Sequence, residues 1–463
     1  MENAVCFVDK NIIKKAENIT YDSRKVREHS IFFAYKGSKT DGNIFVEDIL
    51  KKYNDVYVIS EKKYNDKRCI KVDNTRECMG KIASYFYNNP SSHIKTVGIT
   101  GTNGKTTTTY LLNSIFQSSS IIGTTGYKIK DKLYKLNNTT PESIDLHNIL
   151  HQAKDNKLEF SFMEVSSHAI TFNRIAGINF ALKVFTNISQ DHLDFYGTME
   201  RYAASKISFF KKGDKRVVNI DDKYAHKIIE DGNTITYGFS ANADIFPLEY
   251  SFNTEGIKME LSVFGKTLHI ESKLIGKYNI YNIMCAVGVA SYFGKDANEI
   301  EQGIKNCKTV PGRLEFFKYK DKYAVVDYAH TDDAMVNVLN TLNDIKKNRL
   351  IVVFGAGGDR DVTKRPKMGA AADRLADIVF VTSDNPRSEK IETIISDILS
   401  GIKRRDNIFT EVERKKAILR ALDMAQKNDI VAVLGKGHED YQILNDKTIH
   451  FDDREVIKEH WNI

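Results

Sequence analysis

Short apolar runs alternate with helix-length amphipathic stretches through the middle of the chain. Strands are expected at residues 94–100, 160–165, 181–186 and 216–220, and a helix is expected at 107–117. Strands that alternate with helices are typical of a parallel, doubly wound sheet. The same alternation returns near the C-terminus, with strands expected at 323–326, 350–354, 378–381 and 430–434, and helices at 333–342, 368–375, 389–399 and 414–426.

Two other stretches depart from this alternation. Residues 243–275 consist of short alternating runs with polar turns, which predicts an antiparallel insert, and a helix is expected at 278–292. Residues 1–93 mix short apolar runs with polar turns and end in a linker rich in Asn, Pro and Ser. We therefore expect an α/β protein of three domains: an N-terminal domain (1–93), a central doubly wound domain with the insert (94–311), and a C-terminal Rossmann-like domain (312–463).

The composition narrows the classes of function. Hydrophobic residues make up 41% and charged residues 28% of the 463 residues, as in ordinary globular proteins. No apolar stretch approaches the roughly 18 residues of a membrane span, and the first residues lack a basic region followed by an apolar one. A net charge of +7 is mild for this length. These features predict a cytoplasmic protein that binds neither membranes nor nucleic acid.

A glycine-rich loop between an expected strand and an expected helix predicts a phosphate site. Glycines let backbone N–H groups approach phosphate oxygens, and the helix N-terminus adds a positive dipole. The strict Walker pattern needs glycine where this chain has Ile99, so the loop reads G-x-x-G-x-x-G-K-T. The alternative is a glycine-rich turn with a surface lysine, but strand, glycines, Lys-Thr and helix all agree on a phosphate loop. The expected ATP contacts are Gly101, Thr102, Asn103, Gly104, Lys105, Thr106 and Thr107.

Polar residues follow two further strands of the expected central sheet. Glu164 ends one strand and His192 follows another. Because ligands of open α/β sheets bind at the carboxyl ends of the strands, both residues could converge beside the triphosphate. Together with the Thr106 hydroxyl they are the expected ligands of Mg²⁺. Each of them alone could equally be an ordinary polar loop residue.

The motifs together resemble a known family. The phosphate loop, Glu164-Val-Ser-Ser-His168, Asp191-His192-Leu-Asp194 and Asp327-Tyr-Ala-His330 are similar to those of the Mur ligases of peptidoglycan synthesis. The resemblance runs from Tyr21 to Glu455 and is strongest to the members that add the third residue of the stem peptide. It implies an ATP-dependent ligase for peptidoglycan precursor synthesis, and hence for cell wall biogenesis, cell shape and cell division. It also suggests a monomer.

The resemblance further implies a substrate and a mechanism. The γ-carboxylate of D-glutamate in UDP-MurNAc-L-Ala-D-Glu would attack the γ-phosphorus of ATP to give an acyl phosphate and ADP. The amine of meso-diaminopimelate would then attack the acyl carbon and release phosphate. The third domain would close on the second about a hinge near residues 310–313.

The family's motifs carry over onto individual positions. The residues implied to hold UDP-MurNAc-dipeptide are Tyr21, Ser23, Ser38, Lys39, Thr40, Asn138, Thr139, Thr140, Ser166 and Arg174. Phe172 stands where some relatives have a polar substrate contact, so it is not carried over. The residues implied to hold the nucleotide from outside the loop are Asn279, Asn282, Arg313, Asp327 and His330. The resemblance also implies that CO₂ carbamylates Lys206, which would make it a catalytic group and a ligand for a second Mg²⁺.

The added amino acid would be selected by the C-terminal domain. The implied diaminopimelate contacts are Arg360, Asp384, Asn385, Pro386, Arg387, Gly435 and Glu439. Arg387 offers a bidentate fork to the distal carboxylate, and Asp384 and Glu439 can take ammonium groups. Because L-lysine has no distal carboxylate, Arg387 favours a diamino-dicarboxylic acid. Relatives that add L-lysine lack this arginine. The alternative to a binding role is that Arg387 is an ordinary surface arginine after a proline turn.

Several alternatives stay open at the level of sequence. The same ligase could add L-lysine, LL-diaminopimelate or lanthionine instead. More remote alternatives are a ligase like folylpolyglutamate synthetase, a phosphate-loop ATPase or kinase, and a nucleotide-binding regulator without catalysis. The intact Lys105, Glu164 and His192 argue against the last of these.

Overall fold

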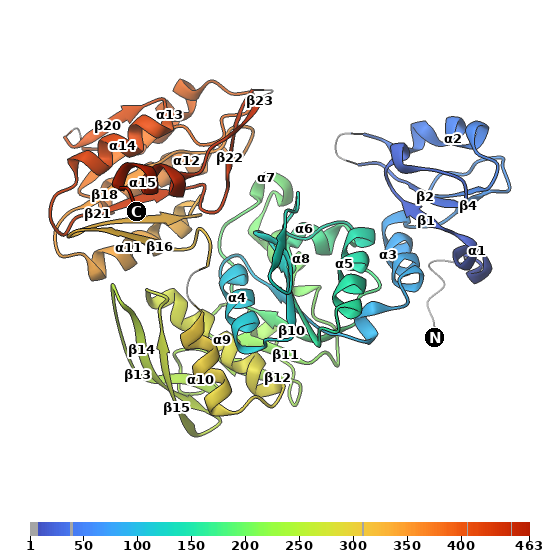
Figure 1. Cartoon of the computed structure of the whole chain (residues 1–463), viewed down its shortest axis with the longest axis horizontal. Coiled ribbons are helices and arrows are strands. Elements are labelled where there is room, and N and C mark those ends of the chain that lie inside the picture. The colour runs from blue at the N-terminus through green and yellow to red at the C-terminus, as the bar shows by residue number, and fades with distance from the viewer. Residues whose placement is uncertain (1–7, 38–39, 308–309, 405, 446) are drawn as a thin grey trace.

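The computed structural model describes residues 8–37, 40–307, 310–404, 406–445 and 447–463. Figure 1 shows three bodies in chain order: a small blue one, a central green and yellow one, and an orange and red one. Each is built on its own sheet. Among the described residues, no helix is both long and apolar enough to cross a membrane.

The N-terminal sheet is parallel throughout. Its strands lie in the order β1 (Asn18–Thr20), β2 (Ser30–Ala34), β3 (Val56–Ser60), β4 (Cys69–Lys71). Ile31 and Phe33 of β2 pack towards α1 (Lys10–Lys15) and α3 (Thr75–Phe86), and Phe32 packs towards α2 (Val46–Lys52) on the opposite face. Strand residues of alternating orientation thus bury both faces of this sheet. Short 3₁₀ turns lie at Ser23–Lys25, Gly42–Phe45 and Pro90–Ser92.

The central sheet has a parallel core that matches the prediction. Its parallel strands run in the order β12 (Thr234–Tyr237), β11 (Arg216–Asn219), β10 (Phe180–Phe185), β5 (Lys95–Thr100), β9 (Phe160–Glu164), β6 (Ser119–Gly123). The strand order reverses around β5, so the crevice of a doubly wound sheet lies at its carboxyl end. The predicted antiparallel insert is confirmed as β13 (Ile245–Asn253), β14 (Gly256–Val263) and β15 (Lys266–Ser272), which continue the same sheet.

Helices cover both faces of this sheet. On one face lie α4 (Lys105–Ile115), α9 (Lys277–Tyr292) and α10 (Ala297–Asn306), and on the other lie α5 (Ser143–Asp155) and α8 (Met199–Ile207). Phe162 and Met163, neighbours on β9, point to opposite faces and belong to the two different cores. The sequence did not predict the second antiparallel edge, β7 (Gly126–Ile129) and β8 (Lys132–Tyr134). The remaining short elements are α6 (Ser167–Thr171), α7 (Leu193–Tyr196) and a 3₁₀ turn at Ala225–Lys227.

The C-terminal sheet is also doubly wound. Its order is β16 (Glu315–Tyr319), β17 (Lys322–Asp327), β21 (Ile430–Leu434), β18 (Leu350–Phe354), β19 (Ile378–Thr382), β20 (Ile408–Glu411), and only the edge strand β16 is antiparallel. One face carries α11 (Asp332–Ile345), α12 (Lys364–Leu375) and α13 (Ile391–Leu399), and the other carries α14 (Arg414–Met424) and α15 (Asp453–Trp461). A hairpin, β22 (Tyr441–Leu444) and β23 (Lys447–His450), lies outside the sheet.

One helix begins earlier than expected. We expected α12 from residue 368, but it starts at Lys364 and includes Pro366 in its first turn. Proline is tolerated there because the first backbone N–H groups of a helix have no partner within it. The extra turn brings Lys364 and Arg365 onto the helix next to the loop that follows β18.

Candidate functional site

The phosphate loop joins the end of β5 to the start of α4. Gly101 and Gly104 both have positive φ, at 152° and 88°. A side chain on Gly101 would meet the Thr186 hydroxyl at 1.8 Å, and one on Gly104 would meet the Asn282 Oδ1 at 2.4 Å. Glycine is therefore required at both positions by conformation and by space.

The end of β10 holds this loop in place. Thr102 N–H donates to the Asn187 carbonyl at 2.8 Å, and Asn103 N–H donates to Asn187 Oδ1 at 2.9 Å. Thr186 Oγ1 donates to the Asn103 carbonyl at 2.7 Å. Two neighbouring strand ends thus fix the loop at the point where the strand order reverses.

Lys105 and Lys206 meet at one carbonyl of the loop. The Lys105 ammonium donates to the carbonyls of Gly101 and Thr102 at 2.8 and 2.9 Å. Lys206 Nζ donates to the same Gly101 carbonyl at 2.9 Å from behind the loop, where its side chain is only 2% exposed. Burial, and then the charge of Lys105, holds the pKa of Lys206 well below its usual range. Burial also lowers the pKa of Lys105.

Glu164 connects the loop to the neighbouring strand end. Its Oε1 accepts from the Thr106 hydroxyl and from Thr124 N–H, both at 2.9 Å, and its Oε2 accepts from the Thr124 hydroxyl at 2.9 Å. Gly123 leaves the space for this carboxylate, because a Cβ there would lie 2.2 Å from Glu164 Oε1. The structure therefore brings two of the predicted Mg²⁺ ligands into direct contact.

This donor set suits Mg²⁺. A carboxylate and a hydroxyl are hard oxygen donors, and Mg²⁺ sites of nucleotide enzymes use one or two protein oxygens together with phosphate oxygens. Within the described part of the chain, no three or more His, Cys, Asp or Glu side chains form a dedicated metal cluster. The residues thus fit an ion that arrives with the nucleotide rather than one held by protein alone.

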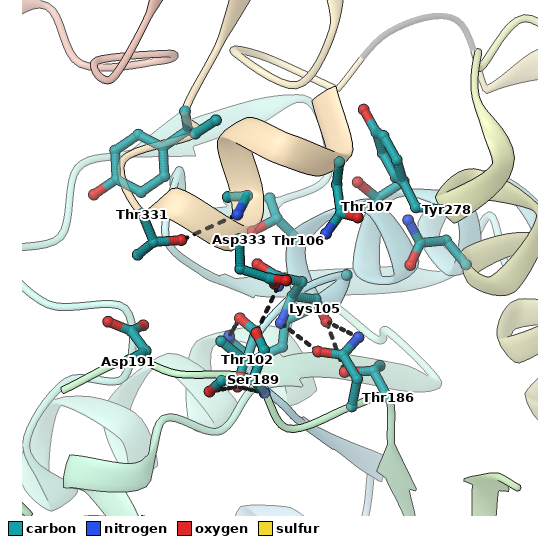
Figure 2. A pocket seen from close by; sticks show the side chains of 18 of the residues that line it. Thr102, Lys105, Thr106, Thr107, Thr186, Ser189, Asp191, Tyr278, Thr331 and Asp333 are labelled. Carbon is teal, nitrogen blue, oxygen red and sulfur yellow. Dashed lines mark hydrogen bonds between the residues drawn. The ribbon is translucent and has the colours of Figure 1, made fainter. Parts of the chain in front are cut away.

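A cavity of roughly 500 Å³ extends from the loop to the C-terminal sheet. His192 and its neighbour Asp191 line one side, and the predicted Arg313, Asp327 and His330 line the other. Figure 2 shows Lys105 and Thr106 facing the start of α11, where Asp333 points towards the loop. Arg313 Nη2 lies 3.4 Å from the Thr106 hydroxyl, and Asn103 Nδ2 lies 3.4 Å from Asp333 Oδ2. Both contacts join the central and C-terminal parts of the chain.

One of the two predicted asparagines of α9 lines this cavity, and the other holds it. Asn279 Nδ2 donates to the Ile275 carbonyl at 2.8 Å, and Asn282 Nδ2 donates to Asn279 Oδ1 at 2.8 Å. Asn282 lines the cavity beside Tyr278. Asn279 therefore orients Asn282 in this arrangement.

Four of the residues predicted for the muramoyl dipeptide gather next to Glu164. The Thr140 hydroxyl donates to the Glu164 carbonyl at 2.8 Å and lies 3.3 Å from the Ser166 hydroxyl. Arg174 Nη1 donates to the Thr140 carbonyl at 3.1 Å, and the Thr139 hydroxyl lies 3.1 Å from that of Thr124. Asn138, the fifth predicted residue of this region, is exposed. The strand end of β9 thus joins the phosphate loop to a polar surface for an acceptor.

The residues predicted for the uridine end belong to the N-terminal part of the chain. The Tyr21 hydroxyl donates to Asp145 Oδ2 of α5 at 2.7 Å, while Ser23 opens a 3₁₀ turn and Thr40 is exposed. Ser38 and Lys39 lie outside the described residues. The contact of Tyr21 with Asp145 joins the N-terminal sheet to the central one.

The two arginines predicted for diaminopimelate meet around Gly357. A Cβ on Gly357 would lie 3.0 Å from Arg387 Nη1 and 3.8 Å from Arg360 Cγ. Arg387 Nη1 donates to the Gly358 carbonyl at 2.6 Å, and Arg387 itself has a left-handed φ of 52°. Arg360 is exposed and donates to the Asp359 carbonyl at 3.2 Å.

The remaining residues of that group form a second contact set. Asn385 Nδ2 donates to Glu439 Oε2 at 2.9 Å. A Cβ on Gly435 would lie 2.5 Å from Asp384 Oδ2, so glycine is needed for this approach. Pro386 is buried and its carbonyl closely faces Gly358. Burial raises the pKa of the Glu439 carboxyl.

Several polar residues of the site were not predicted. Thr124, Asp333 and Lys364 carry no local signal, because each is an ordinary residue for its turn or helix. Asp191 and Lys436 lie inside motifs that the sequence marked, but no role followed from their positions. Thr124, Asp333 and Lys364 were missed because their partners, Glu164, Asn103 and the His330 carbonyl, lie far from them in the sequence.

Models of one family match most of the chain. The Mur ligase family, catalytic domain matches residues 15–87, the Mur ligase middle domain matches 99–290, and the Mur ligase, glutamate ligase domain matches 312–437. The chain is 42% identical to the UDP-N-acetylmuramoyl-L-alanyl-D-glutamate–2,6-diaminopimelate ligase 1 of Clostridium acetobutylicum over 96% of this chain and 94% of that one.

Solved structures give the same result. A structure of a UDP-N-acetylmuramoyl-L-alanyl-D-glutamate–2,6-diaminopimelate ligase superposes with a TM-score of 0.70 at 32% identity, over 96% of this chain and 95% of that one. The MurF ligase of Thermotoga maritima in complex with ADP has a TM-score of 0.66 at 20% identity, over 98% and 99% of the two chains. The second likeness concerns the fold alone.

Proposed function

Because the chain belongs to the Mur ligase family, we propose that it adds meso-diaminopimelate to the D-glutamate γ-carboxylate of UDP-MurNAc-L-Ala-D-Glu. The reaction uses ATP and forms an amide bond in a peptidoglycan precursor. The observation that carries the proposal is the position of Glu164. Its carboxylate contacts the phosphate loop, and its backbone carbonyl contacts the polar surface proposed for the acceptor.

The first step transfers the γ-phosphoryl group of ATP to the acceptor. An oxygen of the γ-carboxylate forms a bond to the γ-phosphorus while the bond to the β–γ bridging oxygen breaks, which leaves an acyl phosphate and ADP. Lys105 supplies positive charge to the transferring phosphoryl oxygens, and the loop N–H groups orient them. Thr106 and Glu164 would hold Mg²⁺, which adds positive charge at the phosphate oxygens.

The acceptor is held by the cluster beside Glu164. Thr139, Ser166 and Arg174 are partly exposed here, so their side chains offer donors to the carboxylates of the dipeptide. The Thr140 hydroxyl is fully buried and already donates to the Glu164 carbonyl, so it positions this cluster instead. Alignment of the carboxylate with the phosphorus is the main contribution of such a site, since positioning alone is worth many powers of ten in rate.

The second step transfers the acyl group to the amino acid. The amine attacks the acyl carbon, the bond to the phosphate oxygen breaks, and the amine loses a proton. Arg387 pairs with the distal carboxylate of diaminopimelate, and Glu439 and Asp384 take its ammonium group. These residues support a diamino-dicarboxylic acid rather than L-lysine.

Lys206 is part of the proposal as a carbamylated residue. A neutral amine forms a bond to the carbon of CO₂ and loses a proton, which turns a cation into an anion. The low pKa of this buried amine supports the reaction, because only the neutral form is nucleophilic. His192, which lines the same cavity, would stabilise charge on the phosphoryl oxygens.

We also propose domain boundaries after residues 93 and 311, and that the chain acts as a monomer. Size-exclusion chromatography with light scattering tests this; a dimer mass at micromolar concentration would refute it.

One assay tests the function. The purified protein is given ATP, Mg²⁺ and UDP-MurNAc-L-Ala-D-Glu, and then meso-diaminopimelate, LL-diaminopimelate, lanthionine or L-lysine in turn. We expect ADP release that depends on the amino acid and is fastest with meso-diaminopimelate. ADP release that ignores the amino acid would refute a ligase, and a preference for L-lysine would refute the role of Arg387.

A further inference from the structure

A lysine in the turn after β21 points into the protein instead of into solvent. Lys436 stands between Gly435 and Gly437, whose φ values are 115° and 53°. A Cβ on Gly437 would lie 2.6 Å from the Cβ of Tyr328, and one on Gly435 would lie 2.5 Å from Asp384 Oδ2. The two glycines let the backbone turn tightly against its neighbours, and the Lys436 side chain is left with no exposed surface.

The ammonium of Lys436 lies under the group proposed to bind diaminopimelate. Its Nζ donates to Glu439 Oε2 at 3.0 Å and lies 3.4 Å from Asn385 Oδ1. Asn385 Nδ2 also donates to Glu439 Oε2, at 2.9 Å. One carboxylate oxygen therefore has two donors, whereas Oε1 has the Tyr441 hydroxyl at 3.4 Å as its only partner among the described residues.

Apart from these two donors, the surroundings of Glu439 disfavour the ionised form of its carboxyl. Burial is the largest effect on its pKa and raises it, and the nearby Asp384 carboxylate, from the loop after β19, raises it further. Tyr328, from the loop after β17, and Tyr441, on β22, face it as neutral phenols. The opposing cations are Lys436 and the buried Arg414 of α14, and Arg414 is already paired with Asp453.

An isolated buried carboxylate usually takes up a proton instead of staying charged. A protonated Glu439 would lose its charge attraction for the ammonium group of a substrate. The binding function of Glu439 therefore depends on a cation that is supplied by the protein itself.

We propose that Lys436 is a positioning residue for the diamino acid: its buried ammonium keeps the Glu439 carboxylate ionised and turned so that Oε1 is left for the substrate's ammonium. The proposal rests on the function proposed above. Lys436 acts through Glu439 and does not touch the substrate. It differs from a lysine that only stabilises the fold, because its loss would make substrate use depend on pH.

The test is the pH profile of Lys436→Met. At about pH 7 we expect its KM for meso-diaminopimelate to rise about tenfold or more, the equivalent of one unit or more of pKa. The KM values for ATP and UDP-MurNAc-dipeptide should stay within about twofold. Its log(kcat/KM) for diaminopimelate should fall towards acid pH and recover towards about pH 9, where Glu439 ionises without help. Wild type is the reference at each pH, because its own profile also reflects loss of the proton from the attacking amine.

A matched control removes a lysine of the same part of the chain. Lys346 pairs with Asp377 at 2.7 Å, at the far end of α11. Lys346→Met makes the same chemical change away from the amino-acid site, so its pH profile should follow wild type. A new acid limb in Lys346→Met as large as that of Lys436→Met would overturn the proposal.

A double variant separates positioning from fold stability. Glu439→Gln should raise the KM for diaminopimelate without a pH-dependent limb, and Lys436→Met added to it should change that KM by less than about twofold. Full additivity of the two changes, or a Lys436→Met profile parallel to wild type, would overturn the proposal.

Wild type gives a second measurement if Lys436→Met does not fold. Calorimetric affinity for diaminopimelate should be constant between about pH 6.5 and 8.5, and an acid limb inside that window would overturn the proposal. Wild type that fails to use diaminopimelate at any pH would instead refute the proposed function.

Discussion

Arg387 combines a strained backbone with the side chain proposed to select the amino acid. Its φ of 52° lies in the left-handed region, which costs a residue with a Cβ roughly 1–2 kcal/mol. Its N–H donates to the Ile443 carbonyl at 3.2 Å, and its carbonyl accepts from Asn445 N–H at 2.9 Å. Strand β22 thus holds the backbone in the strained state. We predict that Arg387→Gly relieves this strain and Arg387→Ala does not.

The magnitudes can be worked from the structure. Both variants lose the hydrogen bond from the guanidinium to the Gly358 carbonyl, worth about 1.5–3 kcal/mol for a charged donor. Glycine regains about 1–2 kcal/mol of strain but loses about 0.5–1 kcal/mol more backbone entropy on folding. Arg387→Gly should therefore be up to about 1.5 kcal/mol more stable than Arg387→Ala, while both have lost the same guanidinium contact.

The single tryptophan makes the measurement local. Trp461 of α15 is 4% exposed and stacks on Tyr319 of β16, so its fluorescence reports unfolding of the C-terminal sheet. Urea unfolding followed by this signal compares the two variants under identical conditions. If Arg387→Ala were more stable than Arg387→Gly by over about 0.5 kcal/mol, the left-handed conformation would be wrong for the protein in solution.

Function should not follow stability in this pair. Both variants lose the pairing with the distal carboxylate, so the KM for diaminopimelate should rise about 30-fold in each, which corresponds to about 2 kcal/mol. The KM for ATP should hardly change. An equal rise in both KM values would contradict the role of Arg387 in amino-acid binding.

Three further predictions concern buried ionisable side chains. Arg414 and Asp453 are both fully buried and paired at 2.7 Å. Followed by Trp461 fluorescence, Arg414→Met should lower the free energy of unfolding by about 3–5 kcal/mol, and the double change with Asp453→Leu should lower it by less than the single change. Additive losses would contradict this prediction. Burial lowers the pKa of His147 to about 4, so its contribution to stability is present above about pH 6.5 and is lost as pH falls towards about 4. In urea unfolding at these two pH values, His147→Gln should remove up to about 3 kcal/mol of the stability that wild type loses in acid. An unchanged acid loss in His147→Gln would refute this prediction. Wild-type activity should fall in CO₂-depleted buffer and return with bicarbonate, whereas Lys206→Met should respond to neither; a wild type indifferent to CO₂ would argue against carbamylation.

The hydrophobic pattern determined most of the fold. Apolar runs of strand length and amphipathic stretches of helix length are local properties, so they located β5, β9, β10 and α9 to within a few residues. The antiparallel insert was equally readable, because its turns and alternation are local too. The β7–β8 edge and the hairpin β22–β23 were missed, since short exposed strands such as residues 132–134 bury no face that a pattern could reveal.

The sequence by itself determined where phosphate and Mg²⁺ could bind. The glycines of the loop, and the rule that ligands meet at the carboxyl ends of strands, needed no knowledge of partners, and Thr106 and Glu164 do lie in contact. Only the tertiary structure decided what Lys436, Lys206 and Tyr21 contact. A lysine or tyrosine in a sequence is a surface residue by default, and its burial is decided by the segments that pack against it. Its partner can be near in the sequence, as Glu439 is to Lys436, or far away, as Asp145 is to Tyr21. Lys436 is buried because two glycines turn it inward against Glu439 and Asn385, and Lys206 because α8 packs behind the phosphate loop.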